Sequence, residues 1–169
     1  MKRVLTCMLA LVTVLALWAV PAFAADSKFK AVTYVTQFQA KPVGDVEGHV
    51  TGTFQRRGLC LYATGEVAVY LAEGALDITK GNGTVKGEST CTFEDGSSST
   101  TTWSMKMTAL PNGLHVYTEG KGEFVRGTGR FEGIQGTTTF SGKTYTPNKG
   151  ETKGDLVMEV EGKYTLPRS

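Results

Sequence analysis

From residue 28 onward, apolar and polar residues alternate along the chain, and clusters of Gly, Asn or Asp interrupt the alternation at short, nearly regular intervals. No long window shows the spacing of three and four residues between apolar positions that is typical of an amphipathic helix. A period of two with frequent turn residues predicts short β-strands and an all-β protein.

The interruptions divide the chain into eight predicted strands. They are expected at residues 29–39, 46–56, 59–71, 84–93, 98–108, 114–125, 134–145 and 155–166. Arg57-Gly58 is the predicted turn between the second and third strands, and Lys80–Gly83 and Asp95-Gly96 are predicted hairpin turns. Gly65 is expected to form a β-bulge, because the apolar residues before and after it fall on opposite faces.

Eight strands in meander order, with no helix to cover them, would leave two sheet edges unpaired. Closing the sheet on itself removes both edges. The predicted fold is therefore an eight-stranded antiparallel barrel of the calycin type, whose interior is wide enough to be filled by side chains or to hold one small ligand. A β-sandwich is the alternative.

The N-terminus has the layout of a secretory signal peptide: a basic start, an apolar run over residues 4–20, then Pro21 and Ala22-Phe23-Ala24. Residues 1–24 are interpreted as this signal and residues 25–169 as a single β-barrel domain. A membrane anchor is the alternative, but the apolar run is slightly short for a span and ends in proline. We expect the protein to be exported to the periplasm or the medium.

The charge of the predicted mature chain is balanced. The sequence has 18 basic and 16 acidic residues, and Lys2 and Arg3 would leave with the signal, so that 16 of each sign remain. A neutral domain without a basic block has no electrostatic footprint for nucleic acid or for an acidic membrane surface. The pattern also predicts no apolar patch that would mark a partner surface.

Cys60 and Cys91 are the cysteines that remain after the predicted cleavage, because Cys7 lies in the apolar run. In an exported chain such a pair predicts one disulfide, and closing this loop would stabilise the fold by roughly 3–4 kcal/mol in the chain-entropy model. Two free core thiols are the alternative. A reactive pair is the least favoured, because no His or Lys adjoins either sulfur to lower the thiol pKa.

The most specific local pattern is the segment Gly127–Gly136, with four glycines around Arg130 and Phe131. It predicts a bend between the sixth and seventh strands, in which Phe131 is an apolar plug and Arg130 ties the loop to the barrel. Its Gly-x-Gly precedes a strand instead of opening a helix, so it is no dinucleotide fingerprint.

Candidate chemistry is sparse. His49 and His115 are the only histidines, and no Cys or carboxylate accompanies them at ligand spacing, so no metal site is predicted. Glu66 and His49 are the candidates for acid–base catalysis, and for both a structural, hydrogen-bonding role is favoured. No serine-nucleophile elbow and no adjacent Cys/His pair is present.

One face of the predicted strands collects aromatic and thioether side chains that are expected to point into the barrel. They are Phe54, Tyr62, Trp103, Met105, Met107, Met158 and Tyr164, with Gly48, Gly52, Gly87 and Gly162 among them. These residues either line a cavity for a small hydrophobic molecule, with glycines supplying volume, or fill a dry core in which glycines let the strands bend.

Four segments in this order carry a family resemblance: Asp45-Val46-Glu47-Gly48-His49, Gly65-Glu66-Val67-Ala68, Thr92-Phe93-Glu94-Asp95-Gly96-Ser97 and Gly127-Thr128-Gly129-Arg130-Phe131-Glu132-Gly133. The chain resembles small secreted bacterial proteins of the allene oxide cyclase/dirigent-like barrel superfamily over nearly all of residues 25–169. The resemblance implies an eight-stranded barrel with a central hydrophobic cavity that works without metal or cofactor. No catalytic residue of that superfamily is assigned to a position of this sequence.

The expected function is therefore that of an exported, cofactor-free barrel that binds a small hydrophobic ligand. A cyclase or isomerase that holds a reactive substrate in one shape, with a rim carboxylate such as Glu66 as base, is the first alternative. A structural or interaction barrel with a filled core is the second.

Overall fold

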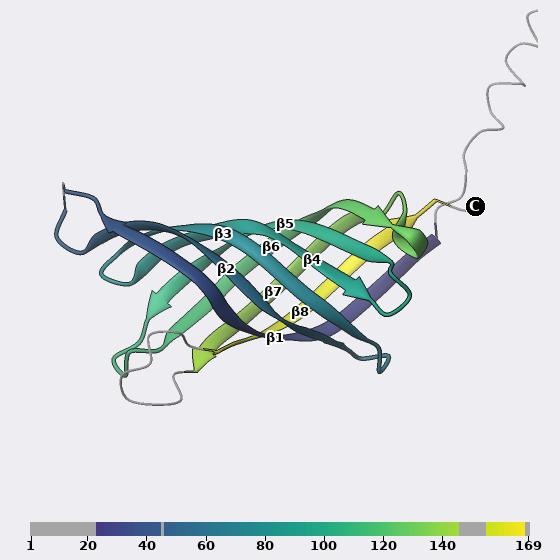
Figure 1. Ribbon diagram of the computed structural model, residues 1–169, viewed down its shortest axis with the longest axis horizontal. Coiled ribbons are helices and arrows are strands. Elements are labelled where there is room, and N and C mark those ends of the chain that lie inside the picture. The colour runs from purple at the N-terminus through teal and green to yellow at the C-terminus, as the bar shows by residue number, and fades with distance from the viewer. Residues whose placement is uncertain (1–22, 45, 146–154, 168–169) are drawn as a thin grey trace, which may run out of the picture.

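The computed structural model describes residues 23–44, 46–145 and 155–167, so nearly all of the predicted signal peptide lies outside the described part. Eight strands form a closed antiparallel barrel in which every strand pairs with its neighbours in sequence and β1 also pairs with β8 (Figure 1). The prediction of an eight-stranded barrel is confirmed, and the sandwich alternative is wrong.

The strands run obliquely to the long axis of the barrel, as Figure 1 shows. Their bounds are β1 Phe23–Pro42, β2 His49–Tyr62, β3 Val67–Thr79, β4 Asn82–Phe93, β5 Ser98–Ala109, β6 His115–Thr128, β7 Gln135–Tyr145 and β8 Asp155–Leu166, with a short 3₁₀ turn η2 at Gly129–Phe131. Within the described ranges, no helix is long and apolar enough to cross a membrane.

Strands β2 and β3 differ from the prediction. Arg57-Gly58 is not a turn, because both residues pair within the middle of β2, with Gly58 opposite Thr33 and Tyr70. The chain reverses after Tyr62 instead, where Gly65 has a φ of 89° and donates its N–H to the Tyr62 carbonyl at 3.0 Å. The predicted bulge at Gly65 is therefore wrong: the parity change that suggested it comes from the turn.

Two other hairpins follow the predicted turn chemistry. Lys80 and Gly81 both have positive φ, 50° and 78°, and the Asn82 side-chain amide donates to the Lys80 carbonyl at 3.0 Å. Gly96 has a φ of 80° between β4 and β5, where Asp95 accepts a bond from the Ser97 N–H. These positions need the left-handed backbone that glycine adopts at little cost.

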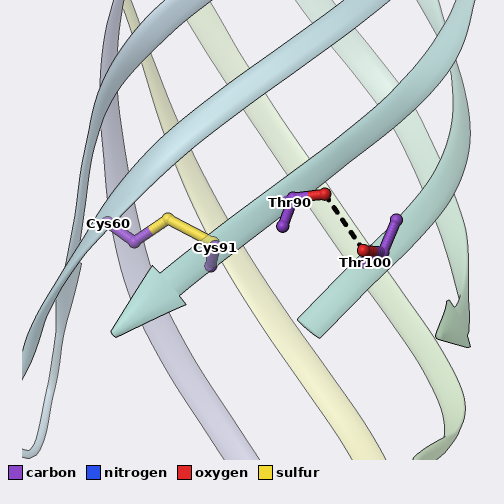
Figure 2. The surroundings of a disulfide bond; sticks show 4 residues. All are labelled: Cys60, Thr90, Cys91 and Thr100. Atoms are coloured by element: carbon purple, nitrogen blue, oxygen red, sulfur yellow. Dashed lines mark hydrogen bonds between the residues drawn. A yellow bond between two sulfur atoms is a disulfide. The ribbon is translucent and has the colours of Figure 1, made fainter. Parts of the chain in front are cut away.

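The predicted disulfide between Cys60 and Cys91 is confirmed (Figure 2). It joins β2 to β4 inside the barrel with a Cα–Cα distance of 6.8 Å, across the intervening strand β3, where Ala68 pairs with Cys60. On the neighbouring strand pair, the Thr90 and Thr100 hydroxyls lie 3.0 Å apart, as Figure 2 also shows. The bridge therefore ties three adjacent strands together.

The outer face of β1, β2 and β3 carries a contiguous apolar patch, contrary to expectation. Its large side chains are each 38–49% exposed: Val32, Tyr34, Leu59, Leu61, Val67 and Leu71. Val32 pairs with Leu59 and Leu61 with Val67, whereas Tyr34 and Leu71 lie on either side of Arg57. The misplaced turn at Arg57-Gly58 hid the patch, because it separated Leu59 and Leu61 from the strand whose outer face they share.

Candidate functional site

The barrel interior contains two cavities that meet in its middle. The small cavity, of about 400 Å³, lies at the end that holds the β2–β3, β4–β5 and β6–β7 connections. The large cavity, of about 850 Å³, lies towards the opposite end. Both are lined by the same four central side chains, Tyr70, Trp103, Met105 and Met158. The side chains therefore do not fill the interior completely.

The structure places all seven side chains that were predicted to face inward on the walls of these cavities. Tyr62 and Tyr164 line the small cavity, and Phe54 and Met107 the large one. The remaining three, Trp103, Met105 and Met158, contact both. Strand alternation was enough to place these seven side chains on the inner face.

Two roles were left open for the inward-facing glycines, supplying cavity volume or letting the strands bend, and the surroundings of Gly87 do not support the first. Gly48 lies in the β1–β2 turn with a φ of 77°, outside the strands. A Cβ at Gly87 would stand 2.9 Å from the Trp103 ring, and one at Gly74 would stand 2.7 Å from the Phe54 ring. These glycines leave room for aromatic rings to lie against the wall, so they do not add open volume.

Arg56 is a charged cavity-lining residue that sequence reasoning missed. It is buried on the inner face of β2 and lines the large cavity. Its Nε donates to Thr33 Oγ1 at 3.0 Å, and one of its terminal nitrogens lies 3.4 Å from the Thr33 carbonyl. The alternation Phe54, Arg56, Gly58, Cys60 was the signal available, but Arg57-Gly58 resembled a solvated turn.

Two buried phenols lie within electrostatic reach of this guanidinium. Burial raises the pKa of Tyr70 and of Tyr117, so both phenols keep their protons at neutral pH and can donate hydrogen bonds. Burial also lowers the pKa of Arg56, yet an arginine side chain remains charged at neutral pH. The large cavity thus has a cation and two neutral donors on an otherwise mainly apolar wall.

Two further polar groups lie along the cavities. His115 lines the large cavity, and burial lowers the pKa of its imidazole, which favours the neutral form. The buried Nε1–H of Trp103 has no hydrogen-bond acceptor among the described residues. A buried donor without an acceptor lowers the free energy of unfolding by about 1–3 kcal/mol.

The glycine-rich loop, residues 127–136, lies at the end of the barrel that contains the small cavity, and it closes one side of that end. Arg130 Nη2 lies 2.6 Å from Glu66 Oε1, and its guanidinium lies 4.5 Å from the centre of the Phe93 ring. The Phe131 ring, which is half-buried, packs on Phe93 at 5.0 Å between ring centres. The loop is thus held by the ion pair of Arg130, the proposed tether, and by the ring contact of Phe131, the proposed plug.

The two weak catalytic candidates lie apart. His49 is on the outer face of β2, with its Nε2 2.8 Å from Asp77 Oδ1, and lines neither interior cavity. Glu66 lines the rim of the small cavity, where its carboxylate is engaged by Arg130. In the part of the chain that the structure describes, no three His, Cys, Asp or Glu side chains are grouped to hold a metal ion.

Fold and site together define a closed antiparallel β-barrel with an apolar, divided interior. No protein-family model and no curated protein matches the chain. Among solved structures it is similar to the pterocarpan synthase dirigent protein GePTS1, at 14% identity and a TM-score of 0.48, over 87% of this chain and 90% of that one. The pterocarpan synthase dirigent protein PsPTS1 is similar at 15% identity and a TM-score of 0.44, over 88% and 97%. Identities this low do not carry an activity from one protein to another.

Proposed function

We propose that this protein is an exported barrel that binds a small hydrophobic molecule inside the barrel. The observation that supports this most strongly is the pair of adjoining interior cavities, whose volumes of about 400 and 850 Å³ fall in the range of small-molecule sites. Their shared wall of Trp103, Met105 and Met158 is soft and aromatic, which suits an apolar ligand.

Export is supported by two independent features. Residues 1–24 have the layout of a signal peptide. The Cys60–Cys91 disulfide is of the kind that persists in oxidising compartments and is rare in the cytosol. Both features agree with a periplasmic or extracellular protein.

Binding has more support than catalysis. The base expected for a cyclase or isomerase, Glu66, is ion-paired at the rim of the small cavity, and His49 lies outside the barrel. Among the residues that the structure describes, the ionisable groups along the large cavity are a guanidinium, two phenols and one imidazole. This set can orient a ligand through hydrogen bonds without any reaction.

The proposal is tested by titrating the purified protein with phenylnaphthylamine, a neutral apolar dye that fluoresces when it leaves water. We expect saturable binding at one site. Ala72→Phe should weaken this binding because Ala72 lines the large cavity, whereas Ala75→Phe, which substitutes the outer face of the same strand, should not. Thermal melting shows whether each variant is folded. Absence of saturable binding, or equal binding by folded Ala72→Phe, would contradict the proposal.

A further inference from the structure

The apolar patch sets the outer face of β1, β2 and β3 apart from that of other strands. Along β5, the exposed outer positions are Thr102, Ser104, Lys106 and Thr108. On β1, β2 and β3, which lie side by side (Figure 1), outer positions carry the six large apolar side chains of the patch. A barrel that stays in water has polar residues on its outside, so these three strands call for another explanation.

Two of these strands have the sequence of strands that are covered on both faces. Residues 59–62 of β2 and 67–72 of β3 are uninterrupted apolar runs, Leu-Cys-Leu-Tyr and Val-Ala-Val-Tyr-Leu-Ala. Such runs are typical of strands buried on both sides, whereas a strand with one solvated face alternates with polar residues. The inner side chains of the runs, such as Cys60 and Ala68, are buried in the barrel, but the outer ones in the patch are 41–49% exposed. The sequence therefore indicates a cover that the single barrel does not provide.

The patch is large enough to form the centre of a protein–protein interface. Its six side chains together expose on the order of 500 Å² of mainly apolar surface, within the range of the largest patch on a typical monomer. A standard interface covers about 800 Å² on each partner, and in homodimers about 65% of that area is apolar. The patch therefore matches the apolar core of one such interface, and the polar residues around it match the rim.

The disulfide holds the strands beneath the patch in place. Cys60 stands between Leu59 and Leu61 on β2, and its bridge to Cys91 ties β2 to β4 across β3. Strand pairing fixes the middle of the patch, because Leu59 lies opposite Val32 on one side and opposite Val69 on the other. A surface that is already ordered loses little conformational entropy when it binds a partner, which favours association.

The charges around the patch suit a second copy of the same face. At one end Lys30 and Glu159 form an exposed pair, with Nζ and Oε1 3.6 Å apart, and towards the other end Arg57 and Glu73 lie on adjacent strands. In the described part of the chain, neither Arg57 nor Glu73 forms an ion pair. A face that carries both signs can meet its own copy without net repulsion, as an interface between identical surfaces requires. A strongly charged partner would find no matching excess of charge here.

We propose that the apolar patch is the centre of a two-fold symmetric interface between two copies of this protein, in which the outer faces of β1, β2 and β3 pack against each other. In such an interface both copies use the same surface, so residues in its middle lie close to their own counterparts. Leu59, with an apolar neighbour on each side, is that middle residue. The cavities lie on the inner side of the strands, so the interface is independent of ligand binding.

The test uses two charged substitutions at the centre of the patch. Sedimentation equilibrium of the purified protein should show a dimer that dissociates on dilution. Leu59→Lys and Leu59→Glu each bring two like charges together and should weaken the dimer by about 30-fold or more, as expected for a residue at the centre of an interface. An equimolar mixture of the two variants should recover the dimer, because opposite charges then face each other. Thr139→Lys, on the exposed outer face of β7, should leave association unchanged.

A second measurement needs no variant and keeps the test decisive if a substituted protein does not fold, which thermal melting would show. Tyr34 in the patch is 49% exposed, and Tyr145 on β7 is 43% exposed. Hydroxyl-radical footprinting should show that Tyr34 becomes protected as the protein concentration rises. Tyr145 should stay equally reactive at all concentrations.

The outcomes decide what covers the patch. A monomer at all concentrations with a fully reactive Tyr34, or association that Leu59→Lys leaves unchanged, overturns the interface. If the wild-type protein associates but the mixed Leu59 variants do not recover, the two-fold arrangement is wrong, because a head-to-tail contact does not bring position 59 to its counterpart. A monomer whose Tyr34 is protected only by phosphatidylcholine vesicles would assign the patch to a lipid surface instead of a second copy.

Discussion

Arg130 and Glu66, 64 residues apart in sequence, are joined by a bond of 2.6 Å from Arg130 Nη2 to Glu66 Oε1. The pair connects the loop after β6 to the β2–β3 turn, and Asp95 Oδ2 lies 3.7 Å from the same guanidinium on the β4–β5 turn. Three connections at one end of the barrel therefore converge on a single arginine.

The pair should contribute little to stability, because its side chains are 41% and 46% exposed. A double-mutant cycle with Arg130→Gln and Glu66→Gln is expected to give a coupling of about 0.2–1 kcal/mol, and less at high salt. The measurement is chemical unfolding of all four proteins. A coupling several times larger would mean that the pair is more strongly desolvated than its exposure indicates.

Phe131→Ala tests the loop's apolar anchor. Deleting a fully buried aromatic costs about 3–5 kcal/mol, but Phe131 is only half-buried against Phe93 and Tyr164. We therefore expect a loss of about 1–3 kcal/mol in the free energy of unfolding. Tyr145→Ala, which truncates an exposed ring on β7, is the control and should cost less. Equal losses in both variants would show that Phe131 does not anchor the loop.

The disulfide should account for much of the barrel's stability. Its two cysteines are 31 residues apart, and opening a loop of that size costs roughly 3–4 kcal/mol in the chain-entropy model. The double variant Cys60→Ala, Cys91→Ala should lose about that much in equilibrium unfolding. The exported protein should resist alkylation without reductant. Labelling of both thiols in the unreduced protein would contradict the bond.

Stability should fall as the solution becomes mildly acidic. Burial lowers the pKa of His115 in the folded state, so the folded protein binds this proton less readily than the unfolded chain does. The stability that neutral His115 confers is present above about pH 6.5, the ordinary pKa, and is lost as pH falls through the lower folded-state pKa. His115→Gln should remove this part of the pH dependence, whereas His49→Gln should keep it. An unchanged slope in His115→Gln would contradict the assignment.

Much of the fold was predictable because inward and outward residues alternate along most strands. Strand β8 was predicted at its observed bounds, and the seven predicted cavity residues all reached a cavity wall. Turns at Lys80-Gly81 and at Gly96 were predictable because each requires positive φ.

Most of the errors come from Arg57-Gly58, where local chemistry and tertiary structure disagree. Arg57-Gly58 has the composition of a turn, yet both residues pair mid-strand, and glycine is needed at position 58 because a Cβ there would overlap the Val32 carbonyl oxygen. Because this pair was interpreted as a turn, the predicted second strand ended at residue 56, although β2 continues to Tyr62. Arg56 was then placed at the end of a strand, and the apolar patch on the outer face of β1, β2 and β3 was not predicted. The pairing of β2 with both neighbours, together with the burial of its side chain, shows that Arg56 is inside.

The most direct test of ligand binding within the barrel uses the methionine methyl groups. Of the five methionines, Met105, Met107 and Met158 line the cavities, and Met1 and Met8 lie in the predicted signal peptide. In protein with ¹³C-labelled methionine methyls, titration with phenylnaphthylamine should shift Met105 and Met158 and give intermolecular NOEs from the dye to these methyls. Binding of the dye without any change at these three methyls would contradict an interior site.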